Sequence, residues 1–412
     1  MRSLHAVLVE HTSPRLIELL AAALDGSGPA LLPLDAGLPP ARLAELIAAF
    51  GPDTIEGLDG DTTARSGKGV AEGTAVIIGT SGSTGTSKGV ELGAGALLHS
   101  ARASLARIGA RPGERWLCCL PGTNIAGLQV LVRSLVGGTE PVLAERADPD
   151  SVAASGCAHV SLVPTQLRRL LAPGVDISTP LAGFSSVLLG GAAAPMSLLD
   201  AARAAGVPVV TTYGMTETCG GCVYDGRPLD GVRVAIGDDD TPDGGDGERI
   251  WIGGPVLFSG YRSLAVAPAA GTGPGDGWFR TGDLGQLDAA GRLTVRGRAD
   301  DVINTGGRKV VPGEVAAALE TCPGVREVAV VGQPDAEWGE RVVAVVVPAD
   351  PADPPALELL RLHVKERLPR YASPSRVVVV DAVPLLPSGK YDIARLKLEL
   401  LRREQTEAEN VI

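Results

Sequence analysis

One ten-residue segment constrains this chain more than any other feature, because residues 80–89 contain only Gly, Ser, Thr and Lys. The segment follows an apolar run, Ala75–Gly79, which predicts a buried strand. Its glycines let the backbone expose N–H groups, while its hydroxyls and one lysine add donors and positive charge, as a polyphosphate requires. The candidate nucleotide-binding residues of this segment are Thr80, Ser81, Gly82, Ser83, Thr84, Gly85 and Lys88.

Two other interpretations of this segment are weaker. It is not a Walker P-loop, because Gly85 is followed by Thr86 rather than by Lys. A flexible linker could have this composition, but a linker rarely connects a strand directly to a helix. Residues Ala94–Ile108 predict a helix after the segment. We therefore expect a phosphate-binding loop between a strand and a helix.

Four further polar segments follow along the chain. Thr212–Thr218 contains Glu217, a single acid beside hydroxyls that suits phosphate-bound Mg²⁺, although a helix cap is the alternative. Trp278–Asp283 ends in an acid suited to ribose hydroxyls, with a turn residue as the alternative. The last two segments are Gly306–Lys309 and Pro387–Lys390. Half of the six lysines of the chain fall within these five segments, which indicates selected positions: Lys88, Lys309 and Lys390.

Composition excludes several classes of function. The net charge of −11 argues against nucleic acid or an anionic membrane as a partner. No apolar run approaches the roughly 18–20 residues of a membrane span. The first residues do not predict a signal peptide, so we expect a cytoplasmic protein. Cys219 and Cys222 lack a second pair of ligands and the five histidines do not cluster, so neither a zinc site nor a Ser-His triad is predicted.

Alternating strand-like and helix-like segments predict an α/β fold of layered subdomains. From Gly231 to Val295 short strands separated by Gly, Asp and Pro predict a twisted antiparallel or barrel-like unit. A smaller α+β unit begins after Arg298. We place the boundary near Asp300, which gives a large N-terminal domain, 1–299, and a small mobile C-terminal domain, 300–412.

Taken in order, the five segments resemble the adenylate-forming superfamily of acyl-CoA synthetases, luciferases and nonribosomal-peptide adenylation domains. The resemblance extends from about Thr74 to Lys390. It implies that ATP, Mg²⁺ and coenzyme A bind, and that Lys390 and Glu217 act in catalysis, Glu217 by holding the metal. The remaining implied residues are Gly191, Ala192, Tyr213, Gly214 and Thr216 beside the adenine, Asp283 and Arg298 at the ribose, Asn124, Gly191 and Gly214 at the acyl group, Gly306 and Gly307 at coenzyme A, and Asp300 as the hinge.

Within the superfamily the chain is most similar to short actinobacterial o-succinylbenzoate–CoA ligases of menaquinone biosynthesis. Three stretches carry this similarity: Ile125–Leu135, Ser161–Leu171 and Tyr213–Val232. Two features depart from the pattern. Few residues precede the phosphate loop, so part of the N-terminal subdomain must be reduced. Asn124 stands where many relatives carry an aromatic residue or His, which implies a changed floor of the acyl pocket.

The expected reaction converts a small-molecule carboxylic acid into an acyl-adenylate and then into a coenzyme A thioester. Three alternatives stay open: another acyl- or aryl-CoA ligase, an adenylation domain that charges a carrier protein, and a non-catalytic nucleotide-binding protein. The candidate partners for a second substrate carboxylate are Arg133, Arg168 and Arg169, which are equally compatible with surface positions. A homodimer is possible, and the sequence does not decide it.

Overall fold

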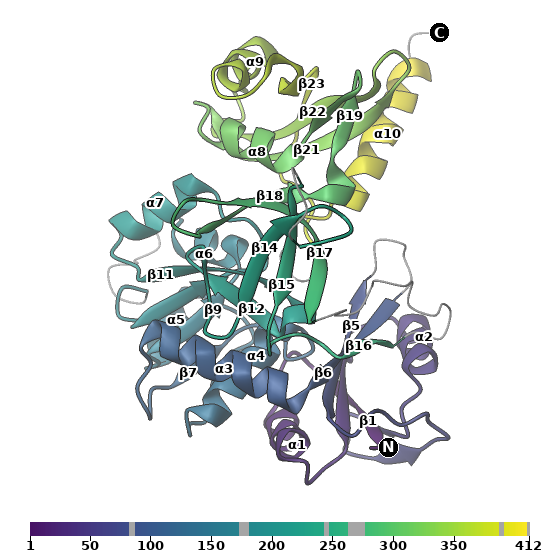
Figure 1. The fold of residues 1–412 in the computed structure, drawn as a ribbon. Helices are drawn as coiled ribbons and strands as arrows, with labels where there is room; N and C mark the ends of the chain where they lie inside the picture. Colours follow the sequence, from purple (N-terminus) through teal and green to yellow (C-terminus); the bar gives the residue numbers. More distant parts are fainter. Residues whose placement is uncertain (82–86, 173–180, 243–246, 263–276, 387–390, 410–412) are drawn as a thin grey trace.

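Two seven-stranded sheets form the body of the molecule, with a four-stranded sheet and a smaller C-terminal unit above them (Figure 1). This computed structural model describes residues 1–412 except 82–86, 173–180, 243–246, 263–276, 387–390 and 410–412. Within the described residues, no helix has the length and apolar character that crossing a bilayer needs.

The first sheet has the strand order β16-β6-β5-β2-β1-β3-β4. Its strands are β1 (Leu4–Val9), β2 (Ala30–Asp35), β3 (Thr54–Glu56), β4 (Thr62–Ala64), β5 (Thr74–Ser81), β6 (Ser87–Gly93) and β16 (Gly260–Arg262). Helices α1 (Pro14–Asp25) and α2 (Pro40–Phe50) connect its parallel strands. Helix α1 begins at a Ser13 cap with Pro14 in its first turn and ends at Gly26, whose φ of +84° suits glycine.

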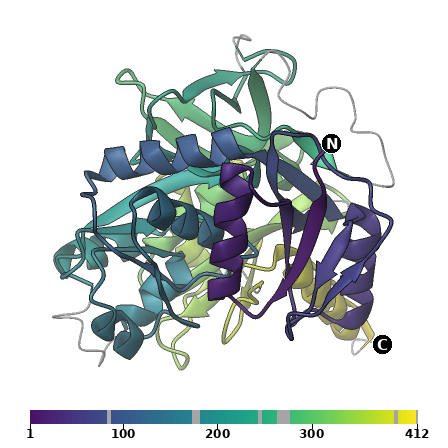
Figure 2. The same cartoon turned by 90° about the horizontal axis from the view of Figure 1, so that it is seen from below.

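The second sheet has the order β13-β12-β11-β10-β9-β7-β8. Its strands are β7 (Trp116–Cys118), β8 (Val142–Leu143), β9 (His159–Leu162), β10 (Ser186–Leu189), β11 (Val209–Met215), β12 (Gly220–Tyr224) and β13 (Arg227–Pro228). The accompanying helices are α3 (Ala94–Ile108), α4 (Ile125–Val136), α5 (Pro149–Ala154), α6 (Pro164–Leu170) and α7 (Met196–Ala204). Helices α1, α3 and α4 pack between the two sheets and share one apolar core with them (Figure 2).

The third sheet is antiparallel, which confirms the prediction for the region between Gly231 and Val295. Its strands are β14 (Arg233–Gly237), β15 (Arg249–Gly253), β17 (Trp278–Leu287) and β18 (Leu293–Arg298). A short 3-10 turn, η2 (Ala299–Asp301), leads from β18 into the C-terminal unit.

The C-terminal unit has its own sheet and its own apolar clusters. Its elements are β19 (Ile303–Thr305), β20 (Arg308–Val310), α8 (Pro312–Glu320), β21 (Val325–Asp335), β22 (Gly339–Pro348), α9 (Leu357–Lys365), β23 (Arg376–Val379) and α10 (Ile393–Glu409). The long β21–β22 hairpin is its main structural element, and successive valines along each strand face opposite sides of the sheet. The predicted α/β fold with a large and a small unit is therefore confirmed.

One local expectation was wrong. The Gly/Ser/Thr segment connects two antiparallel strands, β5 and β6, rather than a strand and a helix. Lys88 lies on β6, where Val90 and Leu92 alternate with polar residues and are fully buried. The strand was not predicted because its first half is rich in Ser, Lys and Gly, which are not strand-favouring residues. A loop in a hairpin still places its backbone N–H groups at a strand end.

Candidate functional site

An open pocket of about 1200 Å³ lies where the two large sheets, the third sheet and the C-terminal unit meet. The carboxyl ends of β9, β10 and β11 contribute Leu162, Gly190 and Gly214 to its wall. This is the edge at which parallel strands of α/β folds commonly expose ligand-binding loops. The pocket is long enough to have two chemically different ends, one rich in charged groups and one lined by α4.

At the charged end, three side chains from distant segments interact. The Tyr261 hydroxyl of β16 donates a hydrogen bond of 2.7 Å to Glu217 Oε1. Lys88 Nζ lies 5.3 Å from the centre of the Tyr261 ring. Burial and the neighbouring carboxylate raise the pKa of Tyr261, so the phenol keeps its proton and remains a donor. Thr80, Lys88 and Glu217 therefore share one wall, with Tyr261 connecting them.

The candidate ribose residues also meet. Asp283 is buried, accepts a hydrogen bond of 2.8 Å from the Tyr213 hydroxyl, and lies 3.6 Å from the Arg298 guanidinium. The pKa of Tyr213 is raised because its hydroxyl is buried beside that carboxylate. The pocket wall itself is formed here by Gly214, Gly282 and Arg298 rather than by Tyr213 and Asp283. A Cβ at Gly282 would lie 2.6 Å from Arg298 Nη2, so a side chain there would displace the Arg298 guanidinium.

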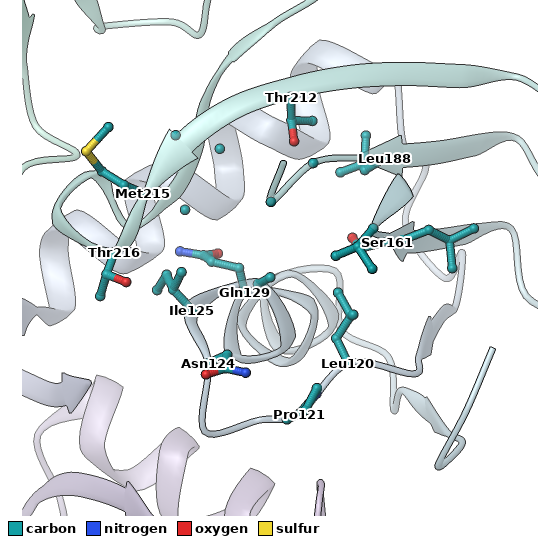
Figure 3. A pocket seen from close by; sticks show the side chains of 18 of the residues that line it. Leu120, Pro121, Asn124, Ile125, Gln129, Ser161, Leu188, Thr212, Met215 and Thr216 are labelled. Atoms are coloured by element: carbon teal, nitrogen blue, oxygen red, sulfur yellow. The ribbon is translucent and has the colours of Figure 1, made fainter. Parts of the chain in front are cut away.

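The other end of the pocket is built on α4. Asn124 precedes the helix, and Ile125 and Gln129 rise from it toward Thr212 and Thr216 (Figure 3). Gln129 Nε2 donates to the Leu97 carbonyl at 3.4 Å, while its Oε1 is buried without a hydrogen-bond partner. A buried polar atom without a partner costs roughly 1–3 kcal/mol, so it favours a ligand that can donate to it.

Arg133 is the most unusual residue of this end. Its side chain is only 6% exposed, lies 4.3 Å above the Trp116 ring, and donates a hydrogen bond of 2.9 Å to the Ser161 hydroxyl. Its Nε is buried without a partner, and no carboxylate of the described residues forms an ion pair with it. Burial lowers the pKa of this guanidinium, the direction expected for a cation removed from water. The pocket wall thus contains an uncompensated positive charge.

The C-terminal unit closes one side of the pocket. Leu385 and Leu386 line it, together with Asp300, which lies 3.8 Å from Arg298. Lys390 and the other residues of Pro387–Lys390 lie outside the described residues, immediately after these leucines. Gly306 and Gly307 are exposed and do not line the pocket, and the backbone N–H of Gly306 donates to the Trp338 carbonyl.

The predicted site residues therefore divide into four groups. The pocket wall contains Thr80, Lys88, Asn124, Gly191, Gly214, Thr216, Glu217, Arg298 and Asp300. Ala192, Gly306 and Gly307 are exposed outside it, whereas Tyr213 and Asp283 lie behind it. Gly82, Ser83, Thr84, Gly85, Lys390 and the side chain of Ser81 lie outside the described part of the structure. Sequence reasoning missed Tyr261, Gln129 and Ser161.

The fold and this pocket are those of an enzyme that binds an adenine nucleotide. Residues 58–262 match the AMP-binding enzyme family, and residues 314–390 match the C-terminal domain of AMP-binding enzymes. The chain belongs to the AMP-binding enzyme family. The resemblance stated from its motifs and the expected class, an AMP-forming acid–thiol ligase, are confirmed.

Two relatives indicate the branch of the family. The chain is 42% identical over 407 residues to a probable 2-succinylbenzoate–CoA ligase of Mycobacterium tuberculosis strain H37Rv, covering 96% of this chain and 97% of the relative. It is 35% identical over 349 residues to a 2-succinylbenzoate–CoA ligase of Bacillus pumilus, covering 79% and 68% of the two chains.

Solved structures agree in fold. The o-succinylbenzoate CoA synthetase of Bacillus subtilis, in complex with its acyl-adenylate intermediate, matches with a TM-score of 0.75 and 28% identity over 96% of this chain and 89% of that chain. ATP-bound MatB from Rhodopseudomonas palustris matches with a TM-score of 0.85 over 97% and 89% of the two chains. Its 24% identity supports the fold alone.

Proposed function

We propose that this protein is an o-succinylbenzoate–CoA ligase of menaquinone biosynthesis, which uses ATP to form an acyl-adenylate and then a coenzyme A thioester. One observation carries the choice of acid: the buried, uncompensated Arg133 in the pocket wall. o-Succinylbenzoate has two carboxylates. One must be activated at the charged end, and the other would neutralise Arg133, whose burial without an acidic partner among the described residues is otherwise unfavourable.

The charged end suits the first displacement. A carboxylate is already ionised at neutral pH, so its attack on the α-phosphate needs no general base. Negative charge grows on the phosphate oxygens in the transition state, and positioned cations stabilise it. Lys88 and Arg298 line this end, and Lys390 follows the described leucines that also reach it. We assign Lys390 to bridge the substrate carboxylate and the α-phosphate.

Glu217 suits the predicted Mg²⁺. It is one carboxylate in the pocket wall, and Tyr261 binds only its Oε1, which leaves Oε2 for a metal. Mg²⁺ prefers one or two carboxylates together with phosphate oxygens, and it supplies charge neutralisation there. This chain's own contribution is to orient Glu217 through the Tyr261 hydroxyl.

The C-terminal unit supports a two-orientation mechanism. Leu385 and Leu386, which precede Pro387–Lys390 in the chain, line the pocket, while Gly306 and Gly307 are exposed outside it. This arrangement suits the adenylation step. Rotation about Asp300, in the η2 turn between β18 and β19, would exchange the two faces for the thioester step. On this basis we keep 1–299 and 300–412 as the proposed domains.

A panel of carboxylic acids tests the substrate assignment. AMP release that depends on coenzyme A would be measured with o-succinylbenzoate, benzoate, a fatty acid, and an o-succinylbenzoate analogue in which the aromatic carboxylate is replaced by hydrogen. We expect the highest kcat/KM for o-succinylbenzoate and a large loss for the analogue. A higher kcat/KM for a monocarboxylate would instead establish another acyl- or aryl-CoA ligase. ATP binding without turnover of any acid would establish a non-catalytic nucleotide-binding protein.

The remaining partners follow from the same proposal. The acid, ATP and coenzyme A are its small-molecule substrates. We propose a cytoplasmic enzyme without a nucleic-acid partner, since the net charge is −11. A homodimer stays a prediction, which the mass of the purified protein in solution would test.

A further inference from the structure

Helix α6 carries two adjacent arginines that point to different parts of the molecule. Arg169 lines the pocket, whereas Arg168 reaches the C-terminal unit. Arg168 Nη1 lies 2.7 Å from Glu327 Oε1 on β21, and the guanidinium also donates a hydrogen bond to the Tyr391 hydroxyl. The two charged side chains are 28% and 22% exposed, so this ion pair is shielded from solvent more than an ordinary surface pair.

Tyr391 belongs to the stem of the loop that carries Lys390. Leu385 and Tyr391 pair as an antiparallel bridge, and the Asp392 N–H donates to the Pro384 carbonyl at 2.8 Å. Tyr391 is thus the residue next to Lys390 and is fixed on one side by this bridge. Arg168 fixes it on the other side, from the large domain.

A rotation about Asp300 would break this contact. A second ion pair between the two parts, Arg296 with Glu314, lies close to the η2 turn in the chain. A rotation about Asp300 displaces atoms near the turn least. Arg168 lies on α6 of the large domain, whereas Glu327 lies on β21 of the C-terminal unit. Their contact cannot survive a large rotation, because charge-assisted hydrogen bonds require close approach.

We propose that Arg168 is a positioning residue that latches the C-terminal unit in the adenylation orientation through Glu327 and Tyr391. The latch holds the stem of the Lys390 loop against the pocket and opens before the thioester step. This inference rests on the proposed function. It adds a residue that acts through Lys390 without touching the substrate.

Separate assays of the two half-reactions test the latch. Arg168→Met keeps the length of the side chain and removes its charge. Losing charge-assisted hydrogen bonds of this kind should slow acyl-adenylate formation about 10-fold or more. Thioester formation from supplied acyl-adenylate should stay unchanged or become faster. An equal loss in both steps, or no change in either, would overturn the proposal. Arg203→Met on α7 is the matched control, because its ion pair with Asp200 is exposed and lies within one helix.

A charge exchange distinguishes the ion pair from packing. Arg168→Glu and Glu327→Arg should each slow adenylation, and the double variant should recover a substantial part of the rate. Failure of the double variant to recover would indicate that Tyr391 alone carries the effect, contrary to the assignment of Glu327.

An orientation measurement is independent of activity. All six cysteines are buried, so dyes can be directed to Glu45→Cys on α2 and Asp353→Cys, both exposed positions. Energy transfer between the dyes should show that fewer molecules have the C-terminal unit docked on the large domain when Arg168→Met is added. An unchanged population would refute the latch even if the enzyme used another acid. If the labelled wild type docks normally but activates no acid, only the proposed function fails.

Discussion

The two ends of the pocket are built in different ways. At the nucleotide end, pocket residues come in pairs from short polar segments: Thr80 and Lys88 from one hairpin, and Thr216 and Glu217 from one turn. At the acyl end, single side chains from separate elements meet: Gln129 and Arg133 from α4, Ser161 from β9 and Leu188 from β10 (Figure 3). The residues for a chemistry that many enzymes share lie in contiguous segments, whereas the residues that select the substrate lie at scattered positions in the chain.

The largest effect should come from the nucleotide end. Lys390→Ala removes a cation assigned to the adenylation transition state, and losing one such contact costs on the order of 10²–10³ in rate. Acyl-adenylate formation should fall by that factor, while thioester formation from supplied acyl-adenylate stays near normal. Rapid-quench measurement of each step checks this. Lys365→Ala, an exposed lysine of α9, is the control. An unchanged adenylation rate would remove Lys390 from the site.

A change at the acyl end should alter selectivity instead. Arg133→Met should raise the KM for o-succinylbenzoate by about 10- to 100-fold, since a hydrogen-bonded charge pair is lost. The KM for ATP and the turnover of the analogue without the aromatic carboxylate should change little. The free energy of unfolding should not fall as it does when one partner of a buried ion pair is removed, because Arg133 has no acidic partner among the described residues. A parallel loss with both acids would mean that Arg133 supports the fold alone.

Local composition was sufficient to single out Lys88 and Glu217, which the structure places in the pocket wall. Their binding of the nucleotide and of Mg²⁺ stays a prediction. The acyl end was harder, since Gln129 and Arg133 are meaningful only on a folded helix. A signal did exist: Ile125, Gln129 and Arg133 are spaced by four residues, so two polar side chains share one face of an otherwise apolar helix.

Neither local composition nor helical periodicity could have identified Tyr261 as a site residue. It reaches Glu217 because β16 pairs with β6, a contact between segments far apart in the sequence. Neither periodicity nor composition around Gly260 predicts which strand it joins. The two units and their order were predictable, because alternating apolar patterns report local structure. Strand pairing over long separations depends on the whole fold.

Tyr261→Phe should have a smaller effect on kinetics, and this effect should be confined to the nucleotide end of the pocket. Removing the hydroxyl leaves Glu217 without its 2.7 Å donor, and one such hydrogen bond contributes about 1 kcal/mol. We expect the KM for ATP–Mg²⁺ to rise several-fold, with the KM for the acid unchanged. Steady-state kinetics with each substrate varied in turn checks this. Tyr371→Phe, in the C-terminal unit and 44% exposed, is the matched control. A change in the KM for the acid alone would show that Tyr261 does not act on the nucleotide end independently of the acyl end.

The smallest effect on activity concerns a residue at neither end of the pocket, whose substitution should change stability instead. Burial raises the pKa of Glu320, beside Arg168, to about 7 from its ordinary 4.5. The folded protein therefore binds this proton more tightly than the unfolded chain. The resulting stabilisation is complete below about pH 4.5 and is lost as the pH rises through about 7, by on the order of 3 kcal/mol. Glu320→Gln should flatten this part of the pH dependence of Tm and leave both half-reactions intact. An identical Tm profile for the variant and the wild type would contradict the assignment.

The pairing of β16 with β6 also has a consequence for biosynthesis. The first sheet consists of residues 4–93 except for this one strand, and Arg262 fastens it by donating to the carbonyls of Phe50 and Gly69, both at 2.7 Å. A ribosome must therefore translate the whole second sheet before the first can close. Until then the β6 edge is an open strand edge, which can pair with other chains. The nascent protein must therefore avoid pairing at that edge while residues 94–262 are translated.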